Sequence, residues 1–209
     1  MSRVYDESDY HGVVDDNYRW YPFFAQRAEI IDDLFRDDYR NQITVVAGSG
    51  WGFLIEELSD RQWNQVYGLD ASPYAVHTAS NRELPTSASR VLEGDILSAS
   101  DLQGFRSDVG RPWFVITEDV LPCAANIAEA ETMLDNLRGF KRPPGDMCHI
   151  ITPRDQTGVL QADGSVAYPW GGQVQMPGFL WLSTQEWLDL IGPGEPVMFT
   201  GSSEWVNTT

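Results

Sequence analysis

Gly48, Gly50 and Gly52 alternate with other residues directly after an apolar, β-branched run at residues 43–47. Such a run is typical of a strand that is buried on both faces of a parallel sheet. The glycines let the chain turn tightly and approach a ligand, and an amphipathic helix then begins at Phe53. This turn would direct a helix N-terminus and several backbone N–H groups at one point, where a phosphate or a carboxylate can bind.

Two further predicted strands end in acidic side chains. Residues 65–72 contain a second apolar strand that ends at Asp70, and residues 90–97 contain a third strand with Asp95 at its end. Asp70 follows the glycines by about 20 residues, the separation at which an acidic side chain can accept hydrogen bonds from two ribose hydroxyls. Three strand ends then meet at the edge where open α/β sheets bind ligands, which predicts a nucleotide-type cofactor.

The order of the glycines distinguishes two kinds of cofactor. A dinucleotide turn has the pattern G-x-G-x-x-G, whereas this chain has G-x-G-x-G and places Phe53 where the third glycine would be. The stretches VVAGSGWG, YGLD and EGDI, in this order and spacing, resemble the motifs of class I S-adenosylmethionine-dependent methyltransferases. The resemblance implies the fold of that family, which is α/β with a doubly wound, mostly parallel, Rossmann-like sheet.

The same resemblance implies S-adenosyl-L-methionine as the cofactor and assigns a role to each motif. The glycine loop would lie against the methionine part, Asp70 would hold the ribose, and Asp95 would meet the adenine amino group. The full set of cofactor-binding residues that we expect is Ala47, Gly48, Ser49, Gly50, Gly52, Asp70, Ala71, Gly94, Asp95, Ile96 and Glu118.

Candidate catalytic residues follow the next two strands. Residues 112–121 form an apolar run that leads into Glu118 and Asp119, where an acid could orient or deprotonate a methyl acceptor. His149 lies in the adjacent strand, and a buried, hydrogen-bonded structural role is the favoured alternative for it. Methyl transfer needs little else, because the protein has only to align the reactants for in-line displacement and exclude water. We therefore expect a methyltransferase acting on a small-molecule acceptor.

Two other functions stay open at this stage. An NAD-dependent oxidoreductase is disfavoured by Phe53 and Asp95, and a catalytically silent cofactor-binding or assembly protein would share all three motifs. The sequence has no nucleophile elbow, no P-loop lysine signature and no Cys/His spacing for a metal, so we expect no metal. Cys123 and Cys148 are expected to be free, buried thiols.

The whole chain, 1–209, is expected to form one methyltransferase-like domain. We divide it into an N-terminal helical extension at 1–40, a cofactor-binding core at 41–153, an insert at 154–182, and a C-terminal helix and strand at 183–209. The extension predicts a helix from Pro22 with Phe23, Ile30, Ile31 and Leu34 facing inward. Asp163-Gly164 predicts a β-hairpin in the insert. A seventh strand could lie only at 204–207, which puts the family's usual closing hairpin in doubt.

The formal net charge is −17, and only one of the 14 basic residues, Lys141, is a lysine. Such a surface repels phosphate backbones and disfavours, without excluding, nucleic acid as a partner. It also suggests a halophilic source, cellular or viral, with an arginine-preferring genome as the alternative. No apolar run is long enough for a membrane span and the N-terminus lacks a signal-peptide pattern, so we expect a cytoplasmic protein. The aromatic residues of the extension and the insert fit a substrate cover, a core or a homo-oligomer contact equally well.

Overall fold

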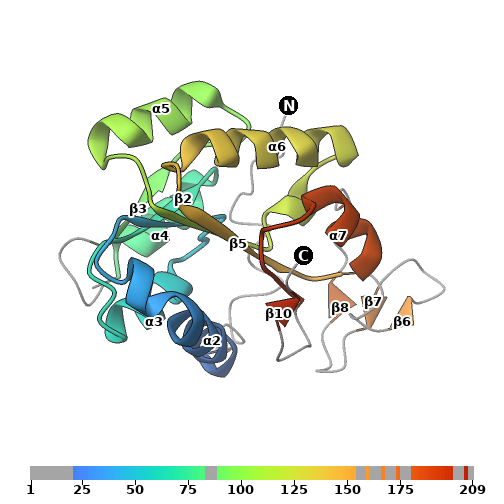
Figure 1. The fold of residues 1–209 in the computed structure, drawn as a ribbon, viewed down its shortest axis with the longest axis horizontal. Coiled ribbons are helices and arrows are strands. Elements are labelled where there is room, and N and C mark those ends of the chain that lie inside the picture. The colour runs from blue at the N-terminus through green and yellow to red at the C-terminus, as the bar shows by residue number, and fades with distance from the viewer. Residues whose placement is uncertain are drawn as a thin grey trace.

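The structure is a computed structural model that describes residues 21–82, 89–153 and 180–199, together with the backbone of four short strands at 159–160, 166–167, 173–174 and 205–206. Its main sheet has seven strands in the order β10-β9-β5-β4-β1-β2-β3. All neighbours are parallel except β10, which runs antiparallel to β9 (Figure 1). The strands are β1 (Thr44–Ala47), β2 (Val66–Asp70), β3 (Arg90–Glu93), β4 (Phe114–Glu118), β5 (Asp146–Ile151), β9 (Val197–Phe199) and β10 (Trp205–Val206).

Helices cover both faces of this sheet, as the predicted doubly wound fold requires (Figure 1). One face packs α2, α3 and α4 against side chains such as Val46 and Ile116, and the other packs α5, α6 and α7 against Val45 and Val115. Successive strand residues point to opposite faces, so both layers are built from the same apolar runs. The helices are α2 (Tyr21–Tyr39), α3 (Phe53–Asp60), α4 (Pro73–Ser80), α5 (Ala99–Asp108), α6 (Ile127–Phe140) and α7 (Thr184–Ile191), with the 3-10 helix η1 (Leu121–Cys123) after β4.

Side-chain caps fix where several helices begin. The Ser72 hydroxyl accepts from the Ala75 N–H at the start of α4, and the Asn126 side chain accepts from the Glu129 N–H at the start of α6. Ser183 and Glu186 form a reciprocal capping box at the start of α7. These caps satisfy backbone donors that have no partner within a helix.

The predicted hairpin of the insert is present and gains a third strand. β6 (Val159–Leu160) pairs antiparallel with β7 (Val166–Ala167), which pairs in turn with β8 (Gln173–Val174). The predicted Asp163-Gly164 turn and the other residues between these strands lie outside the described residues.

A short seventh strand, β10, is also present within the range predicted for it, and it lies at the outer edge of the main sheet.

Two local expectations are wrong. Leu34 was expected to face inward, but 53% of it is exposed, because α2 turns Ala28 and Ile31 toward the sheet instead. β3 ends at Glu93, so Asp95 does not end a strand; it lies in the turn that leads into α5, where Gly94 has already left the ladder.

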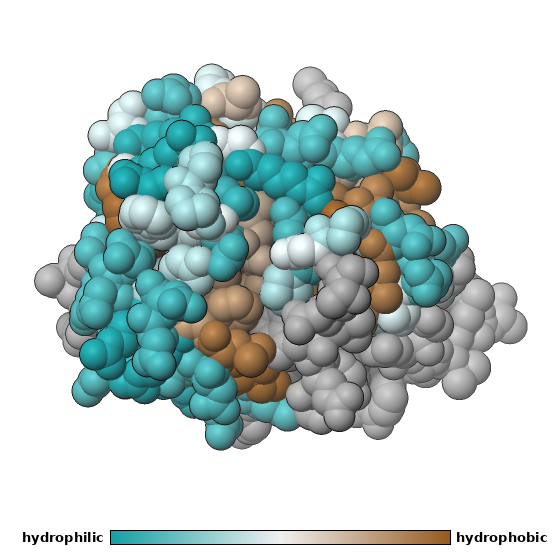
Figure 2. Space-filling view, viewed as in Figure 1, coloured by the Kyte–Doolittle hydropathy of each residue, from teal (hydrophilic) through white to brown (hydrophobic). Residues whose placement is uncertain are grey.

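Within the described residues, no helix is long and apolar enough to cross a membrane, and no three His, Cys, Asp or Glu side chains gather as a metal site. Cys148 is a buried thiol in β5, as expected. Cys123 in η1 was also expected to be buried, but it is partly exposed, and its Sγ donates to the Asp119 carbonyl at 3.4 Å. The described surface in Figure 2 is mostly hydrophilic over α3 and α5, as the acidic composition predicts.

Candidate functional site

The glycine turn after β1 has the conformation that its sequence predicts. The φ angles of Gly48, Gly50 and Gly52 are 73°, 52° and 82°. These values lie in the left-handed region of backbone conformation, which residues other than glycine rarely adopt. The Gly48 N–H donates to the Leu69 carbonyl at 2.8 Å, which ties the turn to the end of β2. Gly52 then directly precedes α3, so the turn brings the N-terminus of that helix to the edge of the sheet.

The surroundings of two glycines differ in an informative way. A Cβ atom on Gly48 would lie 2.5 Å from the Val120 Cβ, so close packing against the residue two places beyond β4 requires glycine there. A Cβ atom on Gly50 would meet no atom of the described residues within 4 Å. This part of the structure therefore leaves space beside the Gly50 backbone, which is what the close approach of a ligand to the turn requires.

Asp70 lies at the end of β2 and bonds directly to the glycine turn. Its Oδ2 accepts from the Gly50 N–H at 2.8 Å, and its Oδ1 accepts from the Ser72 N–H at 2.9 Å. Burial raises the pKa of Asp70, although these two hydrogen bonds oppose the shift. Because two carboxylate oxygens offer about four acceptor positions, Asp70 keeps capacity for ligand hydroxyls.

The turn around Asp95 is tied to the same edge of the sheet. The Gly94 N–H donates to the Asp70 carbonyl at 2.9 Å, and the Asp95 Oδ1 accepts from the Leu97 N–H at 2.8 Å. Asn136 of α6 donates to the Ile96 carbonyl at 2.9 Å and holds the turn from the other side. The second and third motifs are therefore connected by hydrogen bonds, as the predicted site requires.

The remaining predicted cofactor residues lie along the same edge. Ala47 is the buried last residue of β1, and Ala71 is partly exposed beside Asp70. Ser49 is buried within the glycine turn, and its hydroxyl has no hydrogen-bond partner within the described chain. Trp51 in the same turn lies 6.3 Å from the Tyr74 ring of α4, between ring centroids, and adds an aromatic wall that we did not predict.

Glu118 and Asp119, at the end of β4, share one arginine from α2. Arg27 places Nη1 2.6 Å from Glu118 Oε1 and Nη2 3.1 Å from Asp119 Oδ2. The side chains of Arg27 and Glu118 are only 5% and 7% exposed, whereas that of Asp119 is 32% exposed. Burial raises the pKa of Glu118 to about 7, even though the charge and the hydrogen bond of Arg27 oppose the shift. This carboxyl can thus gain or lose a proton near neutral pH.

Asp119 has an unusual backbone, with a φ angle of 47° that places a side-chain-bearing residue in the left-handed region. Its N–H donates to the Ile150 carbonyl of β5 at 2.9 Å. Its Oδ1 is buried without a hydrogen-bond partner in the described part of the chain. Strained residues of this kind gather at functional sites and persist where neighbours hold them in place.

The structure separates His149 from the two acids. His149 and Glu118 point to opposite faces of the sheet, since His149 lies on the face of α6 and α7 with the Glu195 carboxylate 3.0 Å from its Nε2. Its Nδ1 lies 2.8 Å from the Thr117 hydroxyl, and the side chain is fully buried. This arrangement fits the structural role that the sequence analysis favoured.

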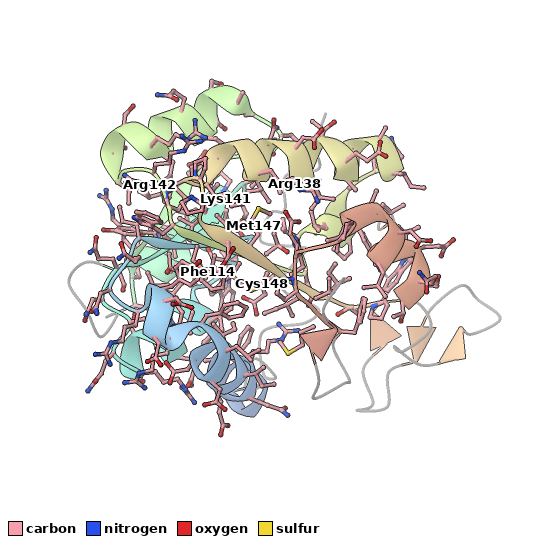
Figure 3. The ribbon with its side chains drawn as sticks, viewed as in Figure 1. Phe114, Arg138, Lys141, Arg142, Met147 and Cys148 are labelled. Carbon is pink, nitrogen blue, oxygen red and sulfur yellow. The ribbon has the colours of Figure 1, made fainter. Side chains whose placement is uncertain are left out.

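Arg138 completes the cluster around His149. Figure 3 shows Arg138 on the side of α6 that faces β5, and it donates to Glu195 at 3.0 Å and to the Ile191 carbonyl at the end of α7 at 2.6 Å. Burial alone would raise the pKa of Glu195, but hydrogen bonds from His149 and Arg138 outweigh it and lower the pKa to about 2. The cluster therefore joins α6, α7 and β5 through the Glu195 carboxylate, which stays charged at ordinary pH.

Sequence reasoning missed Arg27 altogether. An arginine in a helix rich in acids usually belongs to a solvated face, and its two partners lie 91 and 92 positions further along the chain. One signal was present, because residue 27 precedes Ile30 and Ile31 by one helical turn and so shares their inward stripe.

The strand order, the glycine turn and the acid at the end of β2 together define a Rossmann-like fold of the methyltransferase type. No protein-family model matches the sequence, and no curated protein matches it either. Solved structures do match over most of its length.

Three of them cover 90% or more of this chain, and two of these three are named as methyltransferases. DesVI from Streptomyces venezuelae has a TM-score of 0.61 and 17% identity, with 90% of this chain and 89% of that chain covered. The CcbJ methyltransferase from Streptomyces caelestis has a TM-score of 0.60 and 17% identity over 90% and 86%. The sugar N-methyltransferase KedS8 from Streptoalloteichus has a TM-score of 0.59 and 15% identity over 94% and 90%. The chain has the fold of class I S-adenosylmethionine-dependent methyltransferases, as its motifs predicted.

Proposed function

We propose that this protein is an S-adenosylmethionine-dependent methyltransferase with a small-molecule acceptor. One observation carries the proposal: the open glycine turn is hydrogen-bonded to a carboxylate at the end of the next strand, through Gly50 and Asp70. Among the described residues, nothing packs where a side chain on residue 50 would lie, so the turn leaves room there for a ligand. The acceptor class is supported by structures of similar fold, which include a sugar N-methyltransferase and an amino pentose methyltransferase.

The residues present fit this cofactor. The turn at 47–52 would receive its methionine part, Asp70 and Ala71 its ribose, and the turn of Gly94, Asp95 and Ile96 its adenine. When bound, S-adenosylmethionine supplies an electrophilic methyl group on a sulfonium sulfur. The chain itself needs to hold the acceptor in line and exclude water.

Glu118 is the residue that we propose to handle a proton. Its Oε1 is bonded to Arg27, whereas its Oε2 receives no hydrogen bond from the described residues. Oε2 is therefore the atom that can take a proton from an acceptor, and a pKa of about 7 suits that task near neutral pH. Asp119 would orient the acceptor with its partly exposed carboxylate, and His149 would act only on the fold.

Calorimetric titration with S-adenosylmethionine and S-adenosylhomocysteine tests the proposal. We expect micromolar binding by the wild type, a loss of about tenfold or more in Asp70→Ala, and no change in Asp60→Ala, which removes an exposed carboxylate at the end of α3. Preferential binding of NAD would favour the oxidoreductase alternative, and absence of binding at any salt concentration would overturn the proposal.

Turnover separates an enzyme from a silent binding protein. Wild-type protein with S-adenosylmethionine and a panel of amino sugars, amines and phenols should release S-adenosylhomocysteine with at least one acceptor. Tight cofactor binding without release for any acceptor class would instead support the silent module.

A further inference from the structure

Arg27 differs from the other arginine of its helix. The Arg27 guanidinium reaches the Glu118 carboxylate, at the end of β4, and the Asp119 carboxylate directly after it, with two different nitrogens. The Arg27 side chain is 5% exposed. Arg36, nine positions further along α2, bonds to the single acid Asp32 one turn away and is 35% exposed. Arg36 therefore forms an ordinary surface ion pair within α2. Arg27 instead connects α2 to the carboxyl end of β4.

The second bond of Arg27 anchors a strained residue. Hydrogen bonds hold the left-handed backbone of Asp119. The Ile150 carbonyl accepts from its N–H, the Cys123 Sγ donates to its carbonyl at 3.4 Å, and Arg27 donates to its Oδ2. Residues other than glycine rarely adopt this conformation without such support. The arginine bond is the one among these that holds the side chain.

The turn at Asp119 contacts the glycine turn directly. Val120 follows Asp119, and a Cβ atom on Gly48 would lie 2.5 Å from the Val120 Cβ and 3.2 Å from the Glu118 carbonyl. The two turns are therefore packed without space between them, and a shift of one must move the other.

We infer that Arg27 is a positioning residue, which acts through Asp119 and Val120 to hold the glycine turn at Gly48 in the shape that binds the cofactor. This inference rests on the proposed function for its ligand. Its geometric part concerns the two turns alone and can be measured without any ligand.

Arg27→Lys is the sharpest test, because lysine keeps the positive charge beside buried Glu118 but lacks the fork that reaches a second carboxylate. We expect S-adenosylhomocysteine binding to weaken about tenfold, the effect of one lost charge-assisted hydrogen bond, with a melting temperature close to that of the wild type. Arg36→Lys makes the same change on the same helix and should alter the affinity less than twofold.

A rescue variant distinguishes positioning from general damage. Glycine adopts a φ of 47° without an anchor, so Asp119→Gly added to Arg27→Lys should restore most of the affinity that the lysine loses. Hydrogen exchange of the amides at 48–52, measured without ligand, should be faster in Arg27→Lys than in Arg36→Lys and should slow again in the double variant.

Equal affinity and equal exchange in Arg27→Lys and the wild type would overturn the inference. So would a double variant that binds no better than Arg27→Lys and exchanges no more slowly. If the wild type binds no S-adenosylhomocysteine, the proposed function fails, and the exchange rates alone then decide whether Arg27 holds the turn.

Discussion

Two arginine–carboxylate clusters lie on opposite faces of the same two strands, and they differ in what surrounds the central acid. On the face of α2, Arg27 meets Glu118 and Asp119 at the end of β4. On the face of α6 and α7, Arg138 and His149 both bond to Glu195. Burial dominates at Glu118 and raises its pKa to about 7, whereas hydrogen bonds dominate at Glu195 and lower its pKa to about 2.

The opposite pKa shifts of the two acids indicate different roles for the two clusters. The Glu195 cluster is structural, and the Glu118 cluster is the candidate for chemistry. Glu195 receives several donors, joins three elements and stays charged at any ordinary pH, as a structural link should. Glu118 has one oxygen that receives no hydrogen bond from the described residues, and its neighbour Asp119 has a strained backbone. Glu118 can also exchange a proton near neutral pH. Perturbed acids at strand ends are typical of working sites.

Removal of Glu195 should give the largest loss of stability. Glu195→Ala leaves Arg138 and His149 without their shared acceptor, so we expect the free energy of unfolding to fall by about 4 kcal/mol in urea titrations at pH 7. Asp135→Ala is the matched control, since Asp135 lies 3.7 Å from Arg138 with its side chain 80% exposed, and it should cost about 0.5 kcal/mol or less. Equal losses in the two variants would contradict the structural assignment.

The dependence of stability on pH should separate the two acids next. Folded Glu118 keeps its proton up to a pH of about 7, above its ordinary pKa of 4.5, so the folded state binds more protons in this window. The free energy of unfolding should therefore fall by up to about 3 kcal/mol as the pH rises from 4.5 to about 7. Glu118→Gln should remove the part of this fall that Glu118 causes and leave the part due to Asp70, whose pKa burial also raises.

Glu195 should act with the opposite sign and in a lower window. Its contribution is complete above its ordinary pKa of 4.5 and is lost as the pH falls toward about 2. Glu195→Gln should therefore flatten the acid limb of the stability curve and leave the limb between 4.5 and 7 unchanged. If Glu195→Gln instead changed the stability between pH 4.5 and 7, the two acids would not have the separate roles that we assign to them.

Substitutions in the glycine turn should have the next largest effect on stability. Of the two clusters, the turn contacts the one that contains Glu118. Gly48→Ala forces a side chain into a φ of 73° and against Val120, so we expect a loss of about 2 kcal/mol in thermal or urea unfolding. Gly50→Ala carries backbone strain without a clash against the described residues and should cost about 1 kcal/mol. It should nevertheless weaken S-adenosylhomocysteine binding, because the added methyl group would occupy the space where we propose that the ligand approaches the turn. If Gly48→Ala lowered the free energy of unfolding by less than Gly50→Ala, the packing of residue 48 against Val120 would be unimportant.

Salt should have the smallest effect and should leave both clusters intact. Molar KCl screens repulsion among the surface acids of a chain with net charge −17, whereas the enclosed pair of Arg27 and Glu118 is shielded from solvent. For a halophilic protein we expect the melting temperature to rise by about 3 °C, or about 1 kcal/mol. No rise between dilute and molar salt would count against a halophilic source.

The parts of the fold that the sequence predicted are those that depend on local pattern. Apolar β-branched runs located the central strands, and the amphipathic pattern from Phe53 located α3. The end of β3 was predicted too late, because apolar residues continue to residue 97. The strand pairing itself ends at Glu93, before Gly94. The outer position of β10 depends on pairing with β9, which no local pattern specifies.

The candidate site divides in the same way. The glycines and Asp70 were predictable because their roles follow from backbone conformation and spacing within one strand-turn-helix unit. Arg27 was not, since its role exists only after the chain brings together residues 91 positions apart. Likewise, the partner of His149 lies 46 positions away in the loop before β9.

Trp51 gives the glycine turn an optical property. Its indole lies within the segment that the proposed ligand would touch and next to the rings of Phe53 and Tyr74. Indole emission shifts with the polarity and mobility of its surroundings, so the difference in fluorescence between the wild type and Trp51→Phe isolates this residue from the other seven tryptophans. The turn thereby carries its own label, and its state can be followed in real time without attaching a dye.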